Sequence, residues 1–99
     1  MQTVLLVDPQ PLPRKRLGRQ LTARGYRVME AVDGAGAIAA YATARPDVVV
    51  LDRGLADVDG HAPLEILRLL DPGVRAIVSR LGAEQVLERI GRMLAPVVA

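Results

Sequence analysis

Short apolar runs alternate along the chain with longer stretches in which apolar residues recur every three or four positions. A short apolar run bounded by turn residues is typical of a buried strand, and the wider spacing is typical of a helix with one covered face. The pattern predicts strands over residues 3–7, 26–32, 48–51 and 74–79, and helices over residues 11–24, 35–44, 63–70 and 83–94. This regular alternation favours a parallel sheet with right-handed crossovers and helices on both faces.

The expected fold class is therefore α/β, with a flavodoxin-like doubly wound parallel sheet of about four strands in the order 2-1-3-4. The chain has 99 residues, of which 51% are hydrophobic, and this supplies one small core. We expect a single domain over residues 1–99. The helix spacing also predicts which side chains face that core: Leu12, Leu17, Leu21, Ile38, Tyr41, Ala42, Leu64, Leu67, Leu70, Val86, Leu87, Ile90 and Leu94.

Composition argues against several classes of site. The chain contains no cysteine, which removes disulfides, thiolate zinc sites and cysteine nucleophiles, and its only histidine is His61. A zinc centre or a serine, histidine, aspartate triad would rest on that one residue, so neither is expected. The net charge of +2 gives no reason to expect nucleic-acid binding, and no apolar run approaches the ~20 residues of a membrane span. We expect a soluble, cytoplasmic protein.

Acidic or hydroxyl side chains stand at the ends of three predicted strands. Asp8 follows the first strand, Asp52 follows the third, and Ser79 ends the fourth. In open α/β sheets the carboxyl ends of the strands meet at one edge, where ligands bind beside the switch point of the strand order. Gly54 lets the backbone fold back tightly and present a carbonyl oxygen or an amide there. The sequence therefore predicts that Asp8, Asp52 and Ser79 converge.

These segments carry a family resemblance. VLLVD at residues 4–8, RPDVVVLD at 45–52, DVDG at 57–60 and IVS at 77–79 resemble the receiver domain of bacterial response regulators, as does GYRVMEAVDGAGAI at 25–38. The resemblance implies that Asp52 accepts a phosphoryl group from a histidine kinase or a histidine phosphotransfer protein, and that Ser79 contacts the phosphate. It also implies that Asp8, Asp52 and the Gly54 backbone carbonyl hold Mg²⁺. Such a protein acts through protein contacts rather than as an enzyme.

The chain departs from the family pattern at two places. Pro9 stands where the family carries a second acid, so Mg²⁺ is expected to bind weakly. Only residues 80–82 separate the fourth strand from the last helix, whose VLERIGRML resembles the last helix of the family, so the domain is expected to be truncated there. The family lysine has no counterpart, and Arg80 is the nearest cation. The fourth strand then becomes a sheet edge, which residues 96–99 or a second copy can cover, and we expect a homodimer.

Two other interpretations are open. The chain can be a degenerate pseudo-receiver that binds proteins without phosphorylation, which Pro9 and the missing lysine favour. Gly34, Gly36 and Ala39 also fit a G-x-G-x-x-A dinucleotide pattern after a strand, although a second half to hold the nicotinamide is lacking. The basic cluster Arg14, Lys15, Arg16 and Arg19 is interpreted as a solvated helix face.

Overall fold

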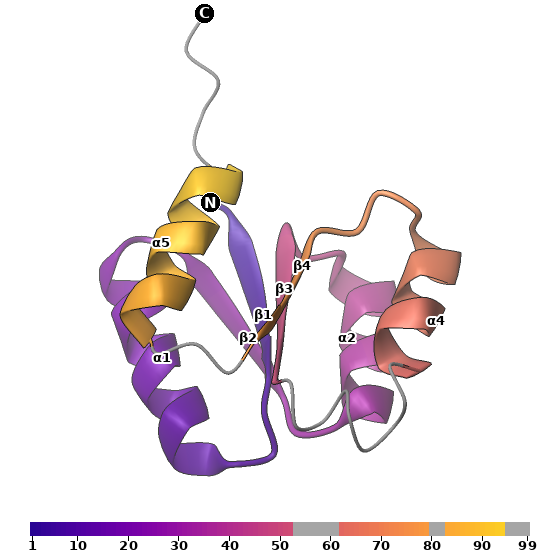
Figure 1. Ribbon diagram of the computed structural model, residues 1–99, viewed down its shortest axis with the longest axis horizontal. Helices are drawn as coiled ribbons and strands as arrows, with labels where there is room; N and C mark the ends of the chain where they lie inside the picture. The colour runs from indigo at the N-terminus through magenta and orange to yellow at the C-terminus, as the bar shows by residue number, and fades with distance from the viewer. Residues whose placement is uncertain (53–61, 80–82, 95–99) are drawn as a thin grey trace, which may run out of the picture.

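The computed structural model describes residues 1–52, 62–79 and 83–94, shown in Figure 1. The elements are β1 (Thr3–Val7), α1 (Pro11–Ala23), β2 (Arg27–Ala31), α2 (Gly34–Ala44), β3 (Val48–Asp52), α4 (Ala62–Leu70), β4 (Ala76–Ser79) and α5 (Ala83–Leu94). All eight predicted elements are confirmed. Strands β2 and β4 begin later than predicted because their first predicted residues belong to turns. The Tyr26 N–H donates to the Leu21 carbonyl, and the Val74 N–H donates to the Asp71 carbonyl.

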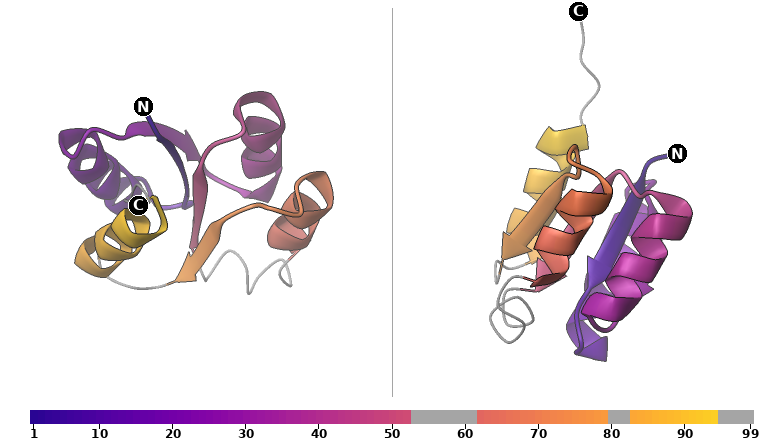
Figure 2. Two further views of the ribbon diagram at one scale, coloured as in Figure 1. Left: turned by 90° about the horizontal axis from the view of Figure 1, so that it is seen from above. Right: turned by 90° about the vertical axis from the view of Figure 1, so that its right-hand side faces the viewer.

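The strands form a parallel sheet in the order β2-β1-β3-β4, which confirms the predicted fold class and strand order. Helices α1 and α5 cover one face of this sheet and helices α2 and α4 cover the other (Figure 2). Within the described ranges, no helix is long and apolar enough to cross a membrane.

Each face of the sheet has its own apolar core. On the α1 and α5 face, Val86, Leu87, Ile90 and Leu94 are buried with Leu21 against alternate residues of β1 and β3. On the α2 and α4 face, Tyr41 and Leu67 are buried against the other residues of those strands. Both β1 and β3 are therefore covered on two sides, which explains why their sequences are continuous apolar runs rather than alternating ones.

Three of the predicted core positions are wrong. Leu12 is 76% exposed and Leu70 is 42% exposed, and Ala42 is also exposed. Leu12 precedes Leu17 by five positions, which places it about 140° around the helix from the buried stripe. Ala42 follows the buried Tyr41 directly and so lies about 100° away from it. Leu70 follows the buried Leu67 by three positions, which places it about 60° around the helix, at the border of the buried face.

Candidate functional site

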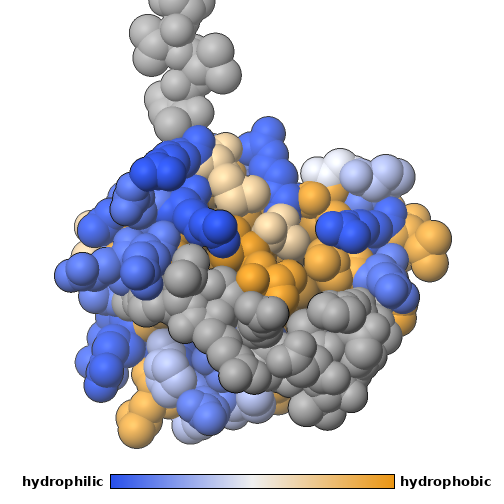
Figure 3. Space-filling view, viewed as in Figure 1, coloured by the Kyte–Doolittle hydropathy of each residue, from blue (hydrophilic) through white to orange (hydrophobic). Residues whose placement is uncertain are grey.

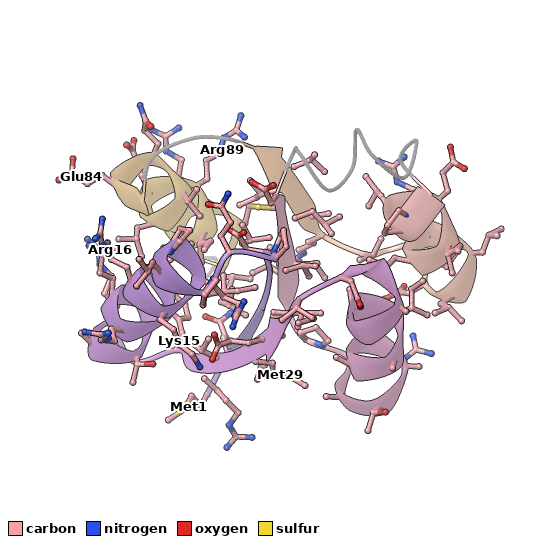
Figure 4. All side chains as sticks on the ribbon, turned by 90° about the horizontal axis from the view of Figure 1, so that it is seen from below. Met1, Lys15, Arg16, Met29, Glu84 and Arg89 are labelled. Atoms are coloured by element: carbon pink, nitrogen blue, oxygen red, sulfur yellow. The ribbon has the colours of Figure 1, made fainter. Side chains whose placement is uncertain are left out.

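The carboxyl ends of β1, β3 and β4 meet at one edge of the sheet. Asp52 is the last residue of β3, and its Cα partner in β4 is Ser79. Val7 is paired with Leu51, so Asp8 leaves β1 at the same level. The strands end at the bottom of Figure 1, and Figure 4 views the molecule from this side. The fold thus brings together the three positions that the sequence predicts to converge, while Gly54 and Arg80 lie outside the described residues.

Local hydrogen bonds fix the chain at Asp8. Its N–H donates to the Ala31 carbonyl at 3.1 Å, which extends the contact with β2 by one residue beyond the paired strand. The Asp8 Oδ1 accepts a bond of 2.9 Å from the Gln10 N–H, an arrangement that closes an aspartate turn. Pro9, between them, has no N–H to donate. The Asp8 carboxylate is therefore held half-buried at the edge of the sheet.

Arg14 is a structural part of this region that sequence reasoning missed. Its Nη1 donates to the Asp8 carbonyl at 2.8 Å, and its Nε donates to Glu30 Oε1 at 2.8 Å. The side chain is only 11% exposed, so the prediction of a solvated basic face is wrong for Arg14. Lys15 also contacts Glu30, at 2.8 Å, but is itself exposed. The sequence feature that could have indicated this contact is Glu30, an acidic residue on β2, the strand beside β1 and Asp8.

The pKa of Glu30 reflects this cluster. The hydrogen bond from Lys15 lowers the pKa most, partial burial opposes it, and the bond from Arg14 lowers it further. Glu30 is therefore ionised at neutral pH and holds the Arg14 guanidinium in place. Through Arg14, the β2 strand supports the carbonyl of Asp8 and with it the turn that carries the candidate carboxylate.

Asp8 and Asp52 supply two carboxylates to the edge, and both residues are half-buried. Within the described part of the chain, no group of three or more histidine, cysteine, aspartate or glutamate side chains is positioned to hold a metal. Two carboxylates offer only oxygen donors, which suit a hard cation such as Mg²⁺ rather than zinc or copper.

The glycines after β2 have a structural explanation. Asp33 is the N-cap of α2, and its Oδ1 accepts a bond of 2.7 Å from the Gly36 N–H. A Cβ at Gly36 would lie 3.1 Å from that oxygen and 3.5 Å from the Ala31 Cβ. Close packing around the cap therefore favours glycine there, and the cap already uses the Gly36 amide, which is then not available to bind a phosphate. The local geometry favours a helix start over a dinucleotide site.

A polar contact joins α2 to the turn that follows α4. The Tyr41 hydroxyl donates to Asp71 Oδ2 at 2.5 Å, and Arg45 lies 3.8 Å from the same oxygen. Burial, then the neighbouring carboxylate, raises the pKa of Tyr41 to about 12. The same hydrogen bond lowers the pKa of Asp71, with a second bond from the Gly73 N–H acting in the same direction. Tyr41 thus remains a donor and Asp71 an acceptor across the neutral range.

Comparison with known sequences identifies the family. Residues 4–93 match the response regulator receiver domain. The transcriptional regulatory protein KdpE of Mycobacterium tuberculosis is 48% identical over 68 residues, which are 69% of this chain and 30% of that protein. The sporulation initiation phosphotransferase F of Bacillus subtilis is 30% identical over 77 residues, which are 78% of this chain and 62% of that protein. The chain thus spans less than two thirds of either relative.

Comparison with solved structures agrees on the fold. The response regulator TrrA of Thermotoga maritima, solved in complex with Mg²⁺ and BeF, superposes with a TM-score of 0.80 at 19% identity, covering 95% of this chain and all of that one. At 19% identity the superposition is evidence for the fold alone, and this fold is consistent with the strand order described above. The sequence match extends over residues 4–93, the range in which Asp8, Asp52 and Ser79 lie. The chain belongs to the receiver domains of two-component response regulators.

Proposed function

We propose that this receiver domain is phosphorylated on Asp52. The position of Asp52 carries the proposal: it ends a strand that is paired on both sides, opposite Ser79 and at the edge where Asp8 leaves β1. The carboxylate attacks the phosphorus of a phosphohistidine, so that a P–O bond forms while the P–N bond breaks and the histidine takes up a proton. The donor is a sensor histidine kinase or a histidine phosphotransfer protein.

Magnesium fits the donor set at this edge. Asp8 and Asp52 would hold the cation through carboxylate oxygens, and Gly54 through its backbone carbonyl. When bound, the cation neutralises charge on the transferred oxygens, which an acyl phosphate at neutral pH requires. Pro9 contributes no side-chain ligand where the family carries a second acid. The site therefore has one negative charge fewer, and its Mg²⁺ affinity is low.

Ser79 has the role of a hydrogen-bond donor to the phosphoryl group. It is the β4 partner of Asp52, so its position in the sheet is next to the acceptor. A phosphoryl group adds about two negative charges, and a neighbouring hydroxyl offers a donor without needing to change its own charge. The result of phosphorylation is passed on through contacts with another protein.

Labelling with a small phosphodonor tests the proposal. Wild-type protein is incubated with acetyl phosphate and Mg²⁺, and intact mass spectrometry follows the gain of one phosphoryl group. We expect slow labelling of the wild type, none in Asp52→Ala, and unchanged labelling in the matched control Glu84→Gln, an exposed acid on α5. Equal labelling of the wild type and Asp52→Ala would remove Asp52 as the acceptor.

The missing acid gives a second test. Pro9→Asp adds a carboxylate beside Asp8, and we expect it to tighten Mg²⁺ binding by restoring a ligand charge. Isothermal titration with MgCl₂ measures the affinity directly, and Pro9→Asn serves as the uncharged control. An affinity for Mg²⁺ that is the same in all three proteins would contradict the proposed metal geometry, in which the side chain at position 9 lies beside the cation.

A pseudo-receiver is the second candidate function. It is favoured by Pro9 and by the absence of any lysine after Lys15 in the sequence. In that case the fold serves as a protein-binding module, and neither labelling nor a response to Mg²⁺ is expected. The labelling experiment separates the two functions, since wild-type protein that takes up no phosphoryl group while remaining folded supports the pseudo-receiver.

A further inference from the structure

Strand β4 is the last strand of the described sheet on its side. The Val49 N–H donates to the Arg75 carbonyl at 2.9 Å, so the backbone groups of Arg75 point toward β3. These directions alternate along a strand, so the backbone N–H and C=O groups of Ile77 also point toward β3. The backbone groups of Ala76 and Val78 point the other way, out from the edge of the described sheet. The edge therefore presents two residues with hydrogen-bonding groups on the open side.

The two sides of this edge differ in chemistry. On the α5 side, a groove of about 340 Å³ is lined by Ala76, Ile77, Met93, Arg89 and Arg92. On the opposite side, Ala76 and Val78 pack with the apolar cluster under α2 and α4. Figure 3 shows apolar surface over β4, bordered on the α5 side by strongly hydrophilic side chains.

The groove is basic. Arg89 and Arg92 line it and are exposed, and the Arg75 Nη1 donates to the carbonyl of Met93, another lining residue, at 3.1 Å. Glu88 forms an ion pair with Arg92 and offsets part of this charge. Glu84 projects from α5 in a different direction from Arg89 (Figure 4). Positive charge therefore gathers along one side of β4, whose outer edge pairs with no other strand of the described residues.

We propose that the β4 edge binds an extended segment of a partner protein in which apolar and acidic residues alternate. Successive side chains of an added strand point to opposite sides of the sheet. Carboxylates at one set of positions then lie beneath Arg89 and Arg92, while apolar side chains at the other set continue the surface of Ala76 and Val78. Main-chain bonds to Ala76 and Val78 supply affinity, and the alternation supplies specificity.

A second copy of this chain fits the edge less well. Antiparallel pairing about Ile77 would bring Arg89 and Arg92 of both copies to the same side of one continuous sheet. Like charges gathered across an interface oppose association, whereas acidic positions complement them. The homodimer expected from the sequence remains a prediction, and the experiment below tests it alongside the proposed occupant.

The probe is a fluorescent seven-residue peptide of alternating valine and glutamate, with capped ends. Its matched control carries lysine in place of glutamate. Fluorescence anisotropy should show binding of the acidic peptide at least about ten-fold tighter than binding of the basic one, the ratio expected for about 1.4 kcal/mol of ion pairing. The affinity for the acidic peptide should fall as salt is raised, because exposed charges are screened.

Variants then locate the site. Arg89→Glu should abolish or reverse the preference for the acidic peptide, whereas Arg16→Glu, an exposed reversal on α1, should leave it unchanged (Figure 4). Val78→Pro removes an outward N–H from the edge and should weaken the binding of both peptides. Since proline can also loosen β4, Arg89→Glu is the deciding variant, and circular dichroism checks that it is folded.

Three outcomes would overturn the proposal. The first is no binding of the acidic peptide at millimolar protein, and the second is equal affinity for the two peptides. The third is a wild-type protein that light scattering shows to be a dimer, and that Val78→Pro converts to a folded monomer, because a second copy would then occupy the edge. None of these results depends on phosphorylation of Asp52.

Discussion

Replacing Gly18 by alanine should stabilise the domain, although Gly18 is buried. A Cβ built at this position would lie 3.6 Å from Val28 Cγ1 and 3.7 Å from Leu6 Cδ1, which are ordinary van der Waals contacts. No neighbour needs to move, so the substitution adds apolar contact between α1 and the sheet. Alanine in place of glycine inside a helix also contributes about 1 kcal/mol by restricting the unfolded chain.

We therefore expect Gly18→Ala to raise the free energy of unfolding by about 1 kcal/mol. For a domain of this size, that corresponds to a rise in Tm of about 4–8 °C. Urea unfolding followed by far-UV circular dichroism measures the free energy, and a thermal scan measures Tm. The slope of the urea dependence should be unchanged, since the surface exposed on unfolding is nearly the same.

Gly36→Ala is the matched comparison, because the same chemical change meets a different environment. Its Cβ would lie 3.1 Å from Asp33 Oδ1, the atom that accepts the Gly36 N–H, so the cap must shift. Loss of an N-cap bond costs about 1 kcal/mol and offsets or exceeds the gain in helix propensity. A Gly18→Ala protein that is less stable than wild type, or a Gly36→Ala protein that gains as much, would refute this reasoning from local contacts.

Tyr41→Phe should destabilise the protein at neutral pH, and urea unfolding at several pH values should show the difference from wild type shrinking at both extremes. The lowered pKa of Asp71 contributes stability that is complete above the unfolded pKa of about 3.9 and is lost as pH falls through the folded pKa. The raised pKa of Tyr41 contributes stability that is complete below about pH 10 and is lost as pH rises to about 12. A difference that stays constant with pH would count against the Tyr41–Asp71 bond. Arg14→Met should cost about 1.5–3 kcal/mol of unfolding free energy, since it removes charge-assisted bonds to the Asp8 carbonyl and to Glu30, and NMR titration should find the pKa of Glu30 nearer its usual value. Unchanged stability and an unchanged Glu30 pKa would show that Arg14 does not support the Asp8 turn.

The sequence by itself determined the elements, their order and the edge where Asp8, Asp52 and Ser79 meet. Hydrophobic periodicity is a local property, so the runs before Asp8 and Asp52 identify buried strands without knowledge of their partners. The alternation of strands and helices then restricts the connections to right-handed parallel crossovers, which place strand ends at a common edge. The family motifs lie in these same segments, and for this reason the family was recognisable as well.

Only the tertiary structure decided which side chains of a helix are covered and which charges are held in place. Leu12 and Leu17 are the same residue type but differ in exposure, because only one side of α1 packs against the sheet. Arg14 belongs to a basic cluster in the sequence, yet packing of α1 beside β2 buries it and directs it to Glu30 and the Asp8 carbonyl. The basic groove beside β4 likewise arises from residues far apart in the chain. Such contacts depend on how two elements pack against each other, which the pattern within a single element does not determine.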